Sequence, residues 1–275
     1  MPHKPKLGQN FLRDQAAIER IAAALGDIAG QTVVEIGPGH GAITRLLAER
    51  AGHVLAIELD HDLVPFLRAQ FPADRVTVVE HDVLHFDFAE AAAAAGHRLA
   101  IAGNLPYYIT SPILLKLAAS HVALDRAILM VQREVADRIV AAPGSRDYGS
   151  LSVTVQMYGP VTPLFTLPPG AFSPPPDVHS TVFRWRFAPR FAELGVEESV
   201  FLPFARLAFA QKRKTLANNL RAAGYEPNDV HVALATSHIA PQARSEELSL
   251  ETLAAVSLAL ANGKAASPGE AASSY

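Results

Sequence analysis

The segment from residue 32 to residue 50 constrains the fold of this chain more than any other stretch. Residues 32–36 read Thr-Val-Val-Glu-Ile and have the apolar character of a short buried strand. A glycine-rich turn, Gly-Pro-Gly-His-Gly, follows at once, and the spacing of apolar residues then predicts a helix over 42–50. A strand, a glycine turn and a helix N-terminus in succession form a place where the backbone can approach a ligand closely.

The glycines of this turn fit two binding patterns. Gly37, Gly39 and Ala42 fit the dinucleotide fingerprint G-x-G-x-x-G/A. Gly37, Gly39 and Gly41 fit the G-x-G-x-G turn of methyltransferases that use S-adenosylmethionine. Glu58 follows Gly37 by 21 residues at the end of a second apolar run, where a carboxylate can accept hydrogen bonds from both ribose hydroxyls of an adenosine cofactor. Both patterns require that carboxylate, so the turn alone leaves the cofactor undecided.

Short apolar runs alternate with helical patterns over the first half of the chain. Four further runs have the length of strands: 54–57, 76–79, 99–102 and 127–131. This alternation predicts a parallel sheet with crossover helices. Residues 164–167 and 181–187 look like late strands. The alternation in residues 150–158 favours another strand, although a helix fits that segment as well.

The pattern changes near residue 188. Beyond it, short helical segments replace the alternation, and the end of the chain is rich in Ala, Ser, Gly and Pro, which predicts a disordered tail. We therefore expect an α/β fold in which a Rossmann-like sheet domain occupies residues 1–188. A smaller all-helical domain would occupy residues 189–262, and the tail residues 263–275.

The stretch after the run 99–102 carries groups suited to a planar substrate. Asn104 offers an amide oxygen, and Pro106 has no N–H and holds Leu105 extended, which leaves nearby carbonyls free to accept hydrogen bonds. Tyr107 adds a flat ring for stacking. Acceptors beside a ring suit the amino group of a nucleobase. An ordinary Asn-x-Pro turn after a strand is the alternative, and this stretch alone does not decide between the two.

Two other side chains could contribute to the same site. Asp82 follows the run 76–79 and could accept a hydrogen bond from an adenine amino group. Phe172 precedes three consecutive prolines, residues 174–176, which stiffen the loop and can present the ring as a second stacking surface. The alternative is that the Phe172 ring only plugs the edge of the sheet.

Composition and charge exclude several classes of function. The chain has no cysteine, which excludes disulfides, cysteine zinc sites and a thiolate nucleophile, and nothing in the sequence suggests a metal. No apolar run has the length of a membrane span and the N-terminus lacks an apolar signal stretch, in agreement with a cytoplasmic location.

Any nucleic-acid contact must be local, because the formal net charge is −3. Residues 199–225 contain no Asp or Glu but five cations: Arg206, Lys212, Arg213, Lys214 and Arg221. A solvated helix face is the usual explanation of surface charge. An uncompensated run of cations instead favours a surface that binds phosphates.

Taken together, the motifs resemble the KsgA/RsmA family of small-subunit rRNA adenine dimethyltransferases, over about residues 4–260. The matching motifs are Gln9-Asn10-Phe11-Leu12, Glu35-Ile36-Gly37-Pro38-Gly39-His40-Gly41, Glu58 and Asp82, Asn104-Leu105-Pro106-Tyr107, and Phe172-x-Pro174-x-Pro176-x-Val178-x-Ser180. Tyr108 departs from the family, because many members have another polar residue there, usually Asn. We expect this difference to affect substrate fit and not the type of reaction.

The resemblance implies a methyltransferase that uses S-adenosylmethionine. The cofactor site would be lined by Asn10, Leu12, Gly37, Gly39, Glu58, Asp82 and Asn104. Glu58 would hold the ribose, Asp82 the adenine end, and Asn104 would lie between cofactor and substrate. The basic helical region would contact RNA.

The resemblance also implies the reaction, which is the transfer of two methyl groups to N6 of each of two adjacent adenines near the 3′ end of 16S rRNA. Hydrogen bonds from the amine to Asn104 and to a carbonyl at Leu105 or Pro106 would localise the nitrogen lone pair. Tyr107 and Phe172 would sandwich the base. The partner would be an immature small ribosomal subunit, bound by a monomer without a metal.

Three other functions fit parts of the sequence. A nicotinamide-dependent dehydrogenase would use the glycine turn and Glu58 but leaves the Asn104 and Phe172 motifs without a role. An RNA-binding assembly factor that is not an enzyme would use the basic residues. A related adenine methyltransferase acting on 23S rRNA and conferring antibiotic resistance would share most of the motifs.

Overall fold

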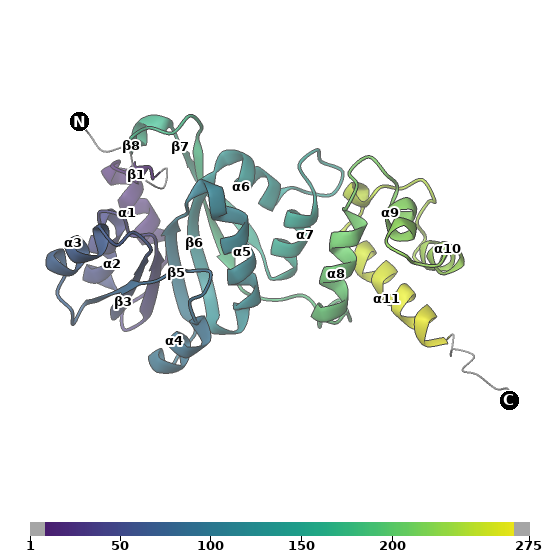
Figure 1. Ribbon diagram of the computed structural model, residues 1–275, viewed down its shortest axis with the longest axis horizontal. Helices are drawn as coiled ribbons and strands as arrows, with labels where there is room; N and C mark the ends of the chain where they lie inside the picture. The colour runs from purple at the N-terminus through teal and green to yellow at the C-terminus, as the bar shows by residue number, and fades with distance from the viewer. Residues whose placement is uncertain (1–8, 267–275) are drawn as a thin grey trace. The chain divides into compact units, whose positions relative to one another are not determined.

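The computed structural model describes residues 9–266, the last four of them as helix backbone only, and the described chain forms two compact units (Figure 1). Residues 9–140 and 158–188 make up the first unit, and residues 141–157 and 189–266 make up the second. The sequence led us to expect domains that are each continuous along the chain. In the structure, segment 141–157 instead leaves the first unit and belongs with the C-terminal helices.

The first unit is built on a seven-stranded sheet in the order β4-β3-β2-β5-β6-β9-β7. Strands β2 to β6 are parallel, and β9 runs antiparallel to both of its neighbours. The strands are β2 (Thr32–Ile36), β3 (His53–Glu58), β4 (Val76–Glu80), β5 (Leu99–Asn104), β6 (Leu124–Gln132), β7 (Val161–Leu167) and β9 (Ser180–Arg186). A separate short ribbon pairs β1 (Phe11–Leu12) with β8 (Phe172–Ser173).

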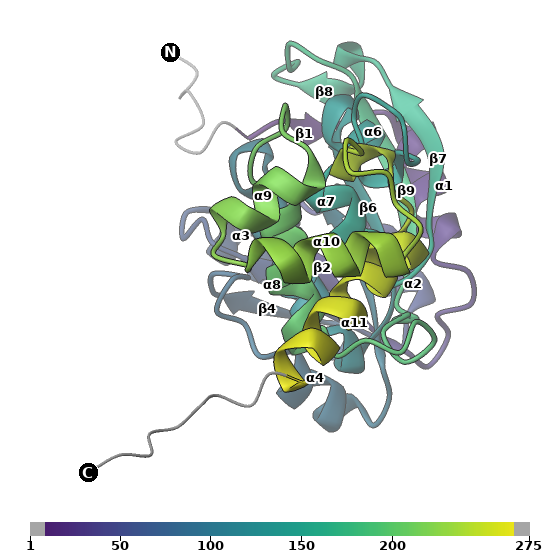
Figure 2. The same cartoon turned by 90° about the vertical axis from the view of Figure 1, so that its right-hand side faces the viewer.

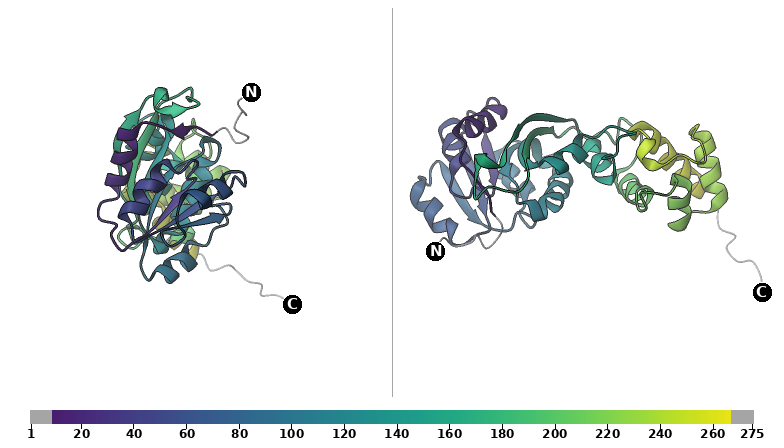
Figure 3. Two further views of the ribbon diagram at one scale, coloured as in Figure 1. Left: turned by 90° about the vertical axis from the view of Figure 1, so that its left-hand side faces the viewer. Right: turned by 90° about the horizontal axis from the view of Figure 1, so that it is seen from above.

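Helices cover both faces of this sheet (Figure 3). The helices are α1 (Gln15–Ala24), α2 (Ala42–Arg50), α3 (Leu63–Gln70), α4 (Phe88–Ala95), α5 (Thr110–Ala119) and α6 (Arg133–Val140), with 3-10 turns η1 (Tyr107–Ile109), η2 (His121–Ala123) and η3 (Pro169–Ala171). Val33 and Ala100 share one buried cluster with Ile21 of α1 and Leu47 of α2. Because successive side chains of a strand point to opposite faces, the buried Val34 packs on the other side.

The strand order places the functional motifs at one edge of the sheet. Ile36 pairs with Ile57 of β3 on one side and with Gly103 of β5 on the other, so β2, β3 and β5 end level with one another. The chain leaves β2 towards β3 and later returns to pair β5 with the opposite side of β2. Such a reversal of strand order opens a crevice beyond the carboxyl ends of the strands, which is where open α/β sheets bind ligands.

The second unit contains only helices among the residues described (Figure 2). They are α7 (Ser150–Met157), α8 (Glu198–Ala208), α9 (Leu216–Ala222), α10 (Pro227–Thr236), η4 (Ser245–Glu247) and α11 (Leu250–Ala266). The expected α/β fold with a smaller helical domain is therefore confirmed. Helix α11 includes residues 263–266, the first four of the expected tail, and residues 267–275 lie outside the described part of the chain. Among residues 9–266, no helix combines the length and the apolar character needed to cross a membrane.

The segment 150–158 corrects the sequence-based expectation of a strand. Residues Ser150–Met157 form helix α7, whose buried residues include Val153, Val155 and Met157. A helix satisfies its own backbone hydrogen bonds, whereas a strand requires a partner strand. Because α7 packs with α8 in an all-helical unit, it has no strand to pair with.

Gly159, two residues after the end of α7, is a position where the fold requires glycine. It has φ +136°, and a Cβ added to it would clash with the Arg186 carbonyl oxygen and lie 2.8 Å from the Ala188 nitrogen. We expect Gly159→Ala to lower the free energy of unfolding by about 3 kcal/mol, since backbone strain and overpacking each cost on the order of 1–3 kcal/mol. Urea denaturation measures the change. Gly170→Ala, where an added Cβ meets nothing within 4 Å, is the matched control. Equal stability of the two variants would contradict the prediction.

Candidate active site

A cavity opens at the carboxyl edge of the sheet in the first unit. It is lined by the turn after β2, the ends of β3 and β4, the loop after β5 and strand β1. It brings together ten residues to which the sequence analysis assigned a role: Asn10, Leu12, Gly37, Gly39, Glu58, Asp82, Asn104, Leu105, Pro106 and Tyr107. Phe172 does not line it, and the five cations of residues 199–225 belong to the second unit.

The glycine turn is shaped for the close approach of a ligand. Gly39 has φ +58°, and a Cβ added to it would lie 2.9 Å from Cδ1 of Phe11. Glycine alone tolerates both conditions without strain. The Gly39 N–H donates a hydrogen bond to Oε2 of Glu58 at 3.1 Å. The turn therefore presents bare backbone to the cavity and is tied to the carboxylate at the end of β3.

Backbone donors from both sides hold the Glu58 carboxylate in place. Its Oε1 accepts hydrogen bonds from the N–H groups of Leu59 and Asp60, each at 2.9 Å, while Oε2 accepts from Gly39. The side chain is 4% exposed, and burial raises the pKa of the carboxyl above its ordinary value, against these hydrogen bonds, which lower it. A carboxylate fixed in this way can accept further hydrogen bonds from a ribose through its remaining lone pairs.

Glu35 is a site residue to which sequence reasoning gave no role of its own. It lies in the middle of the apolar strand β2, is 1% exposed and lines the floor of the cavity. Its Oε2 has no hydrogen-bond partner among the described residues. Burial, together with the charge of nearby Glu58, raises the pKa of Glu35 to about 7. A carboxylate in an otherwise apolar strand was the available signal, because such groups are rarely buried without a purpose.

The raised pKa of Glu35 predicts a pH-dependent stability. A folded-state pKa of about 7 against 4.5 means that the folded chain binds more protons between these values, so stability falls as pH rises from 4.5 to 7. The loss amounts to about 3 kcal/mol at pH 8, at 1.36 kcal/mol per pKa unit. We expect Glu35→Gln to remove most of this loss in urea titrations at pH 5 and pH 8. The exposed Glu49→Gln should retain the wild-type pH dependence. An unchanged dependence in Glu35→Gln would contradict the prediction.

Asn104 is oriented by the N-terminal segment. Its Nδ2 donates to the Asn10 carbonyl oxygen at 2.9 Å, a contact between positions 94 residues apart. Because one amide N–H is committed in this way, the orientation of the amide plane is defined and Oδ1 is left as an acceptor. No donor among the described residues takes up Oδ1.

The sequence did not decide whether the carbonyl of Leu105 or that of Pro106 accepts a hydrogen bond from the adenine amine, and the backbone after Asn104 distinguishes them. The Pro106 carbonyl already accepts hydrogen bonds from the Ile109 N–H at 3.2 Å and from the Thr110 hydroxyl at 3.0 Å. The Leu105 N–H donates to the Met130 carbonyl at 3.0 Å, which anchors the loop to β6. The Leu105 carbonyl receives no such bond within the described chain. Leu105, and not Pro106, therefore supplies the unengaged backbone acceptor.

Tyr107 and Tyr108 occupy different positions at the cavity. The Tyr107 hydroxyl is hydrogen-bonded to Oγ of Ser180 at 2.8 Å, and burial raises the pKa of this phenol. This bond fixes the ring at the cavity wall. Tyr108, the residue at which the chain departs from the family pattern, is 58% exposed and lies at the mouth of the cavity. Its position is that of a residue that contacts a bound substrate at its periphery.

Phe172 lies in the core. It is 4% exposed and forms strand β8, where it pairs with Leu12 of β1. Both side chains belong to the buried cluster under the sheet. The ring is therefore covered by core side chains, and stacking of a base on Phe172 would require the β1–β8 ribbon to move.

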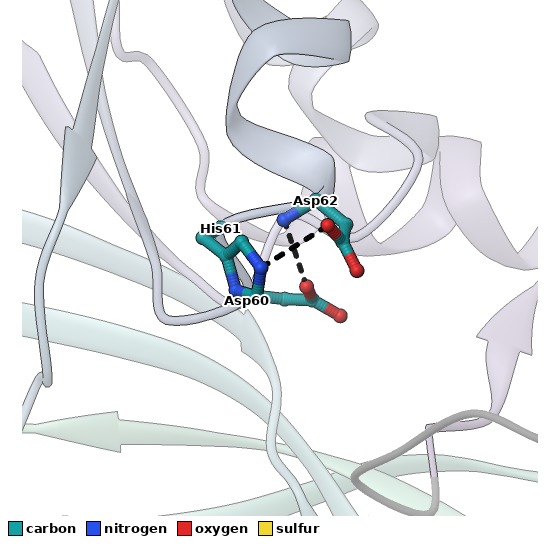
Figure 4. Close-up of side chains that lie close together, drawn as sticks. All are labelled: Asp60, His61 and Asp62. Carbon is teal, nitrogen blue, oxygen red and sulfur yellow. Dashed lines mark hydrogen bonds and ion pairs between the residues drawn. The ribbon is translucent and has the colours of Figure 1, made fainter.

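The acidic residues near the rim have local partners. Asp82 Oδ1 accepts from the Leu84 N–H at 2.9 Å, and Oδ2 lies 3.4 Å from Nδ1 of His85. Asp60, His61 and Asp62 form a cluster after β3 (Figure 4). Within the cluster, the Asp62 N–H donates to Asp60 Oδ1 at 3.0 Å, and His61 Nε2 lies 3.2 Å from Asp62 Oδ1. Exposed acidic groups of this kind are common without an ion.

The five cations of residues 199–225 are all exposed. Arg206 lies in α8, Arg221 lies in α9, and Lys212, Arg213 and Lys214 lie in the loop between these helices. We call residues 212–214 the basic loop. Lys212 Nζ donates to the carbonyl oxygen of Arg146 at 2.9 Å, which brings a further exposed cation to the loop. Sequence reasoning missed Arg146 because it is 66 residues from its neighbour and stands beside Asp147.

The fold and cavity define the class of protein. The antiparallel β9 sets this sheet apart from the parallel sheet that binds dinucleotides, and the Asn104 loop has no role in hydride transfer. Three features fit S-adenosylmethionine, the polar and cationic cofactor of a class of methyltransferases. They are the glycine turn without side chains, the Glu58 carboxylate held by backbone N–H groups, and the Glu35 oxygen that has no partner among the described residues. The chain matches the model of the family described as ribosomal RNA adenine dimethylase over residues 2–262, and it belongs to that family.

Relatives in two bacteria agree with this assignment. The chain is 58% identical over 255 residues to the ribosomal RNA small subunit methyltransferase A of Acidobacterium capsulatum, covering 92% of this chain and 90% of the relative. It is 47% identical over 263 residues to the protein of that name from Koribacter versatilis, covering 91% of this chain and 92% of that relative.

Solved structures show the same fold. The 23S rRNA methyltransferase ErmE is 26% identical and superimposes with a TM-score of 0.69, covering 92% of this chain and 100% of that one. A dimethyladenosine transferase from Plasmodium falciparum superimposes with a TM-score of 0.75 at 21% identity, covering 92% of this chain and 98% of that one. The family model and the bacterial relatives confirm the expected family of rRNA adenine dimethylases and its cofactor, S-adenosylmethionine.

Proposed function

We propose that this protein dimethylates N6 of each of two adjacent adenines near the 3′ end of 16S rRNA, during assembly of the small ribosomal subunit. The observation that carries the proposal is the convergence of the glycine turn, Glu58 and Asn104 in one cavity of a chain 58% identical to a small subunit methyltransferase A. S-adenosylmethionine supplies an electrophilic methyl group when it is bound. The residues of the chain bind it, orient the adenine and exclude water.

The adenine amine is a poor nucleophile, because its lone pair is delocalised into the ring. Oδ1 of Asn104 and the Leu105 carbonyl would each accept one N–H of the amine, which favours a pyramidal nitrogen and localises the lone pair. The Asn10 carbonyl keeps the Asn104 amide in the orientation that this requires. Holding nucleophile and methyl group in line supplies much of the rate, since proximity and orientation are worth on the order of 7–11 kcal/mol in favourable cases.

Tyr107 would stack on the extruded base. Its ring is held by the bond to Ser180, so little conformational entropy is lost when a base packs against it. Phe172 would complete the sandwich only after the β1–β8 ribbon has shifted, because its ring is buried in the structure. Tyr107 is therefore the first stacking partner in this proposal. No strong general base is needed, because the amine becomes acidic once it has accepted the methyl group.

The substrate would be rRNA within an immature subunit, bound through the basic residues of the second unit. Arg206, Arg221 and the basic loop have no acidic neighbour in residues 199–225, so they can pair with phosphates. One copy of the chain carries both the cavity and the basic loop, in keeping with action as a monomer. A substrate assembled in the cytoplasm places the enzyme there.

The test is methyl transfer from labelled S-adenosylmethionine to small subunits that lack the modification, followed by mass spectrometry of the rRNA nucleosides. Dimethyladenosine in 16S rRNA is the expected result. Label in 23S rRNA instead would assign the chain to the branch that contains ErmE. Tight binding to the particle without any transfer would leave an assembly factor and would overturn the role of Asn104.

A further inference from the structure

A second hollow lies within the helical unit. It is formed by α9, by the second half of α10 and by the turn that follows α10, and it measures about 470 Å³. This is within the range of clefts that hold small ligands, roughly 300–1,000 Å³. Leu234 and Ile239, both nearly buried, contribute to its apolar floor.

Four exposed polar side chains surround this floor. They are Asn218 and Arg221 of α9, His231 of α10, and Gln242 of the turn. Within the described residues, none of these four side chains makes a hydrogen bond or ion pair. No Asp or Glu lines the hollow. Two amides, an imidazole and a guanidinium around an apolar floor supply donors, acceptors and planar groups without a negative charge.

The basic loop adjoins the hollow along the chain. Lys214 is followed directly by Thr215, which lines the hollow and caps α9 by accepting a hydrogen bond from the Asn218 N–H at 3.2 Å. The Leu216 N–H donates to the Ala243 carbonyl at 2.9 Å, which holds the turn after α10 against the start of α9. Because the basic loop and the hollow meet at Thr215, one nucleic-acid strand can contact both.

We propose that the hollow binds an unpaired nucleobase of the rRNA strand whose phosphates are held by the basic loop. This inference rests on the proposed function and adds a second point at which the protein reads the RNA. The apolar floor would receive the face of the base, and Arg221 or His231 would stack on it or pair with its phosphate. The amides of Asn218 and Gln242 would hydrogen-bond the edge of the base.

A protein segment is the less fitting occupant. An apolar peptide would leave four polar side chains without partners at its border, and burying them unpaired is costly. A nucleotide satisfies them, because it carries a polar edge, an aromatic face and a negative charge together. The positive charge of the adjoining basic loop favours the nucleotide further.

Filling the hollow without changing any charge tests the inference. Ala235 lines the hollow from α10 and is exposed, so tryptophan can be placed there without disturbing the core. We expect Ala235→Trp to weaken binding to protein-free 16S rRNA and to immature subunits about tenfold. The dependence of binding on salt should not change, because the number of paired phosphates is the same. Gln242→Ala, which removes an exposed amide only, should weaken binding in the same direction.

Ala192→Trp, on an exposed turn of the same unit, is the matched control and should bind as the wild type does. Wild-type affinity of both Ala235→Trp and Gln242→Ala would overturn the inference. So would a loss seen with particles but not with protein-free rRNA, since the occupant would then be a ribosomal protein. Failure of the wild-type protein to bind or methylate small-subunit rRNA would instead overturn the proposed function.

Discussion

Asn104→Ala is expected to lower kcat for methyl transfer about 10²- to 10³-fold while the cofactor still binds within a few-fold of the wild-type affinity. The amide acts on the amine as that nitrogen becomes pyramidal, so its contribution is larger in the transition state than in the ground state. Removal of one preorganised hydrogen-bonding group from an active site typically costs that factor, on the order of 3–4 kcal/mol. Single-turnover transfer to small subunits gives the rate, and calorimetric titration with S-adenosylhomocysteine gives the cofactor affinity.

Asn228→Ala controls for the loss of an exposed amide that belongs to the other unit and does not line the cavity, and it should leave both quantities unchanged. Asn104→Asp tests the donor and acceptor groups of the amide separately. It keeps an acceptor oxygen but replaces the donor to the Asn10 carbonyl with a second acceptor, so the side chain is repelled from that carbonyl. We expect a loss in kcat close to that of Asn104→Ala. Near-normal turnover by Asn104→Ala with the cofactor bound would remove the amide from the mechanism.

The placement of the cofactor residues could be predicted from the sequence, because it follows from strand ends. Gly37, Glu58 and Asn104 each come at the end of an apolar run, and parallel strands bring such ends to one edge. The choice between the Leu105 and Pro106 carbonyls could not be predicted. It depends on the turn η1 and on Thr110, which together occupy the Pro106 carbonyl.

Phe172 and Glu35 show that the burial of a side chain is harder to predict from the sequence than its place at a strand end. The ring of Phe172 could serve a cavity or a core equally well, and only its pairing with Leu12 across the β1–β8 ribbon decides. That pairing joins segments 160 residues apart, which no local pattern reveals. Glu35 had a detectable signal, since it interrupts an apolar strand, but the unpartnered oxygen is a property of the assembled fold.

The sheet was easier to predict from the sequence than the segment 141–157. Apolar runs separated by helical patterns define a parallel sheet, and strands β2 to β6 agree with the runs to within a few residues. Segment 150–158 carries apolar residues at spacings that suit either a strand or a helix. Its choice of helix depends on packing with α8, whose sequence begins some 40 residues later. Tertiary context decides such cases, and local periodicity does not.

Removing the charge of the basic loop is expected to have the largest effect on RNA binding. The triple variant Lys212→Ala, Arg213→Ala, Lys214→Ala should bind small-subunit rRNA about 10²-fold more weakly at physiological salt. Each neutralised phosphate contributes close to 0.9 to the slope of log affinity against log salt, so the slope should become shallower by about 2 to 3. Filter binding at several salt concentrations measures both quantities. Catalysis at saturating substrate should fall much less, since the cavity lies in the other unit.

The charge-preserving triple variant, Lys212→Arg, Arg213→Lys and Lys214→Arg, is the matched control. It should retain the wild-type slope, because counterion release depends on the number of charges and not on the type of side chain. It also tests the contact of Lys212 with the Arg146 carbonyl, which arginine can replace as a donor. A wild-type slope in the alanine variant would mean that the loop is only a solvated turn. An equal loss in both triple variants would mean that the shape of the loop, and not its charge, determines RNA binding.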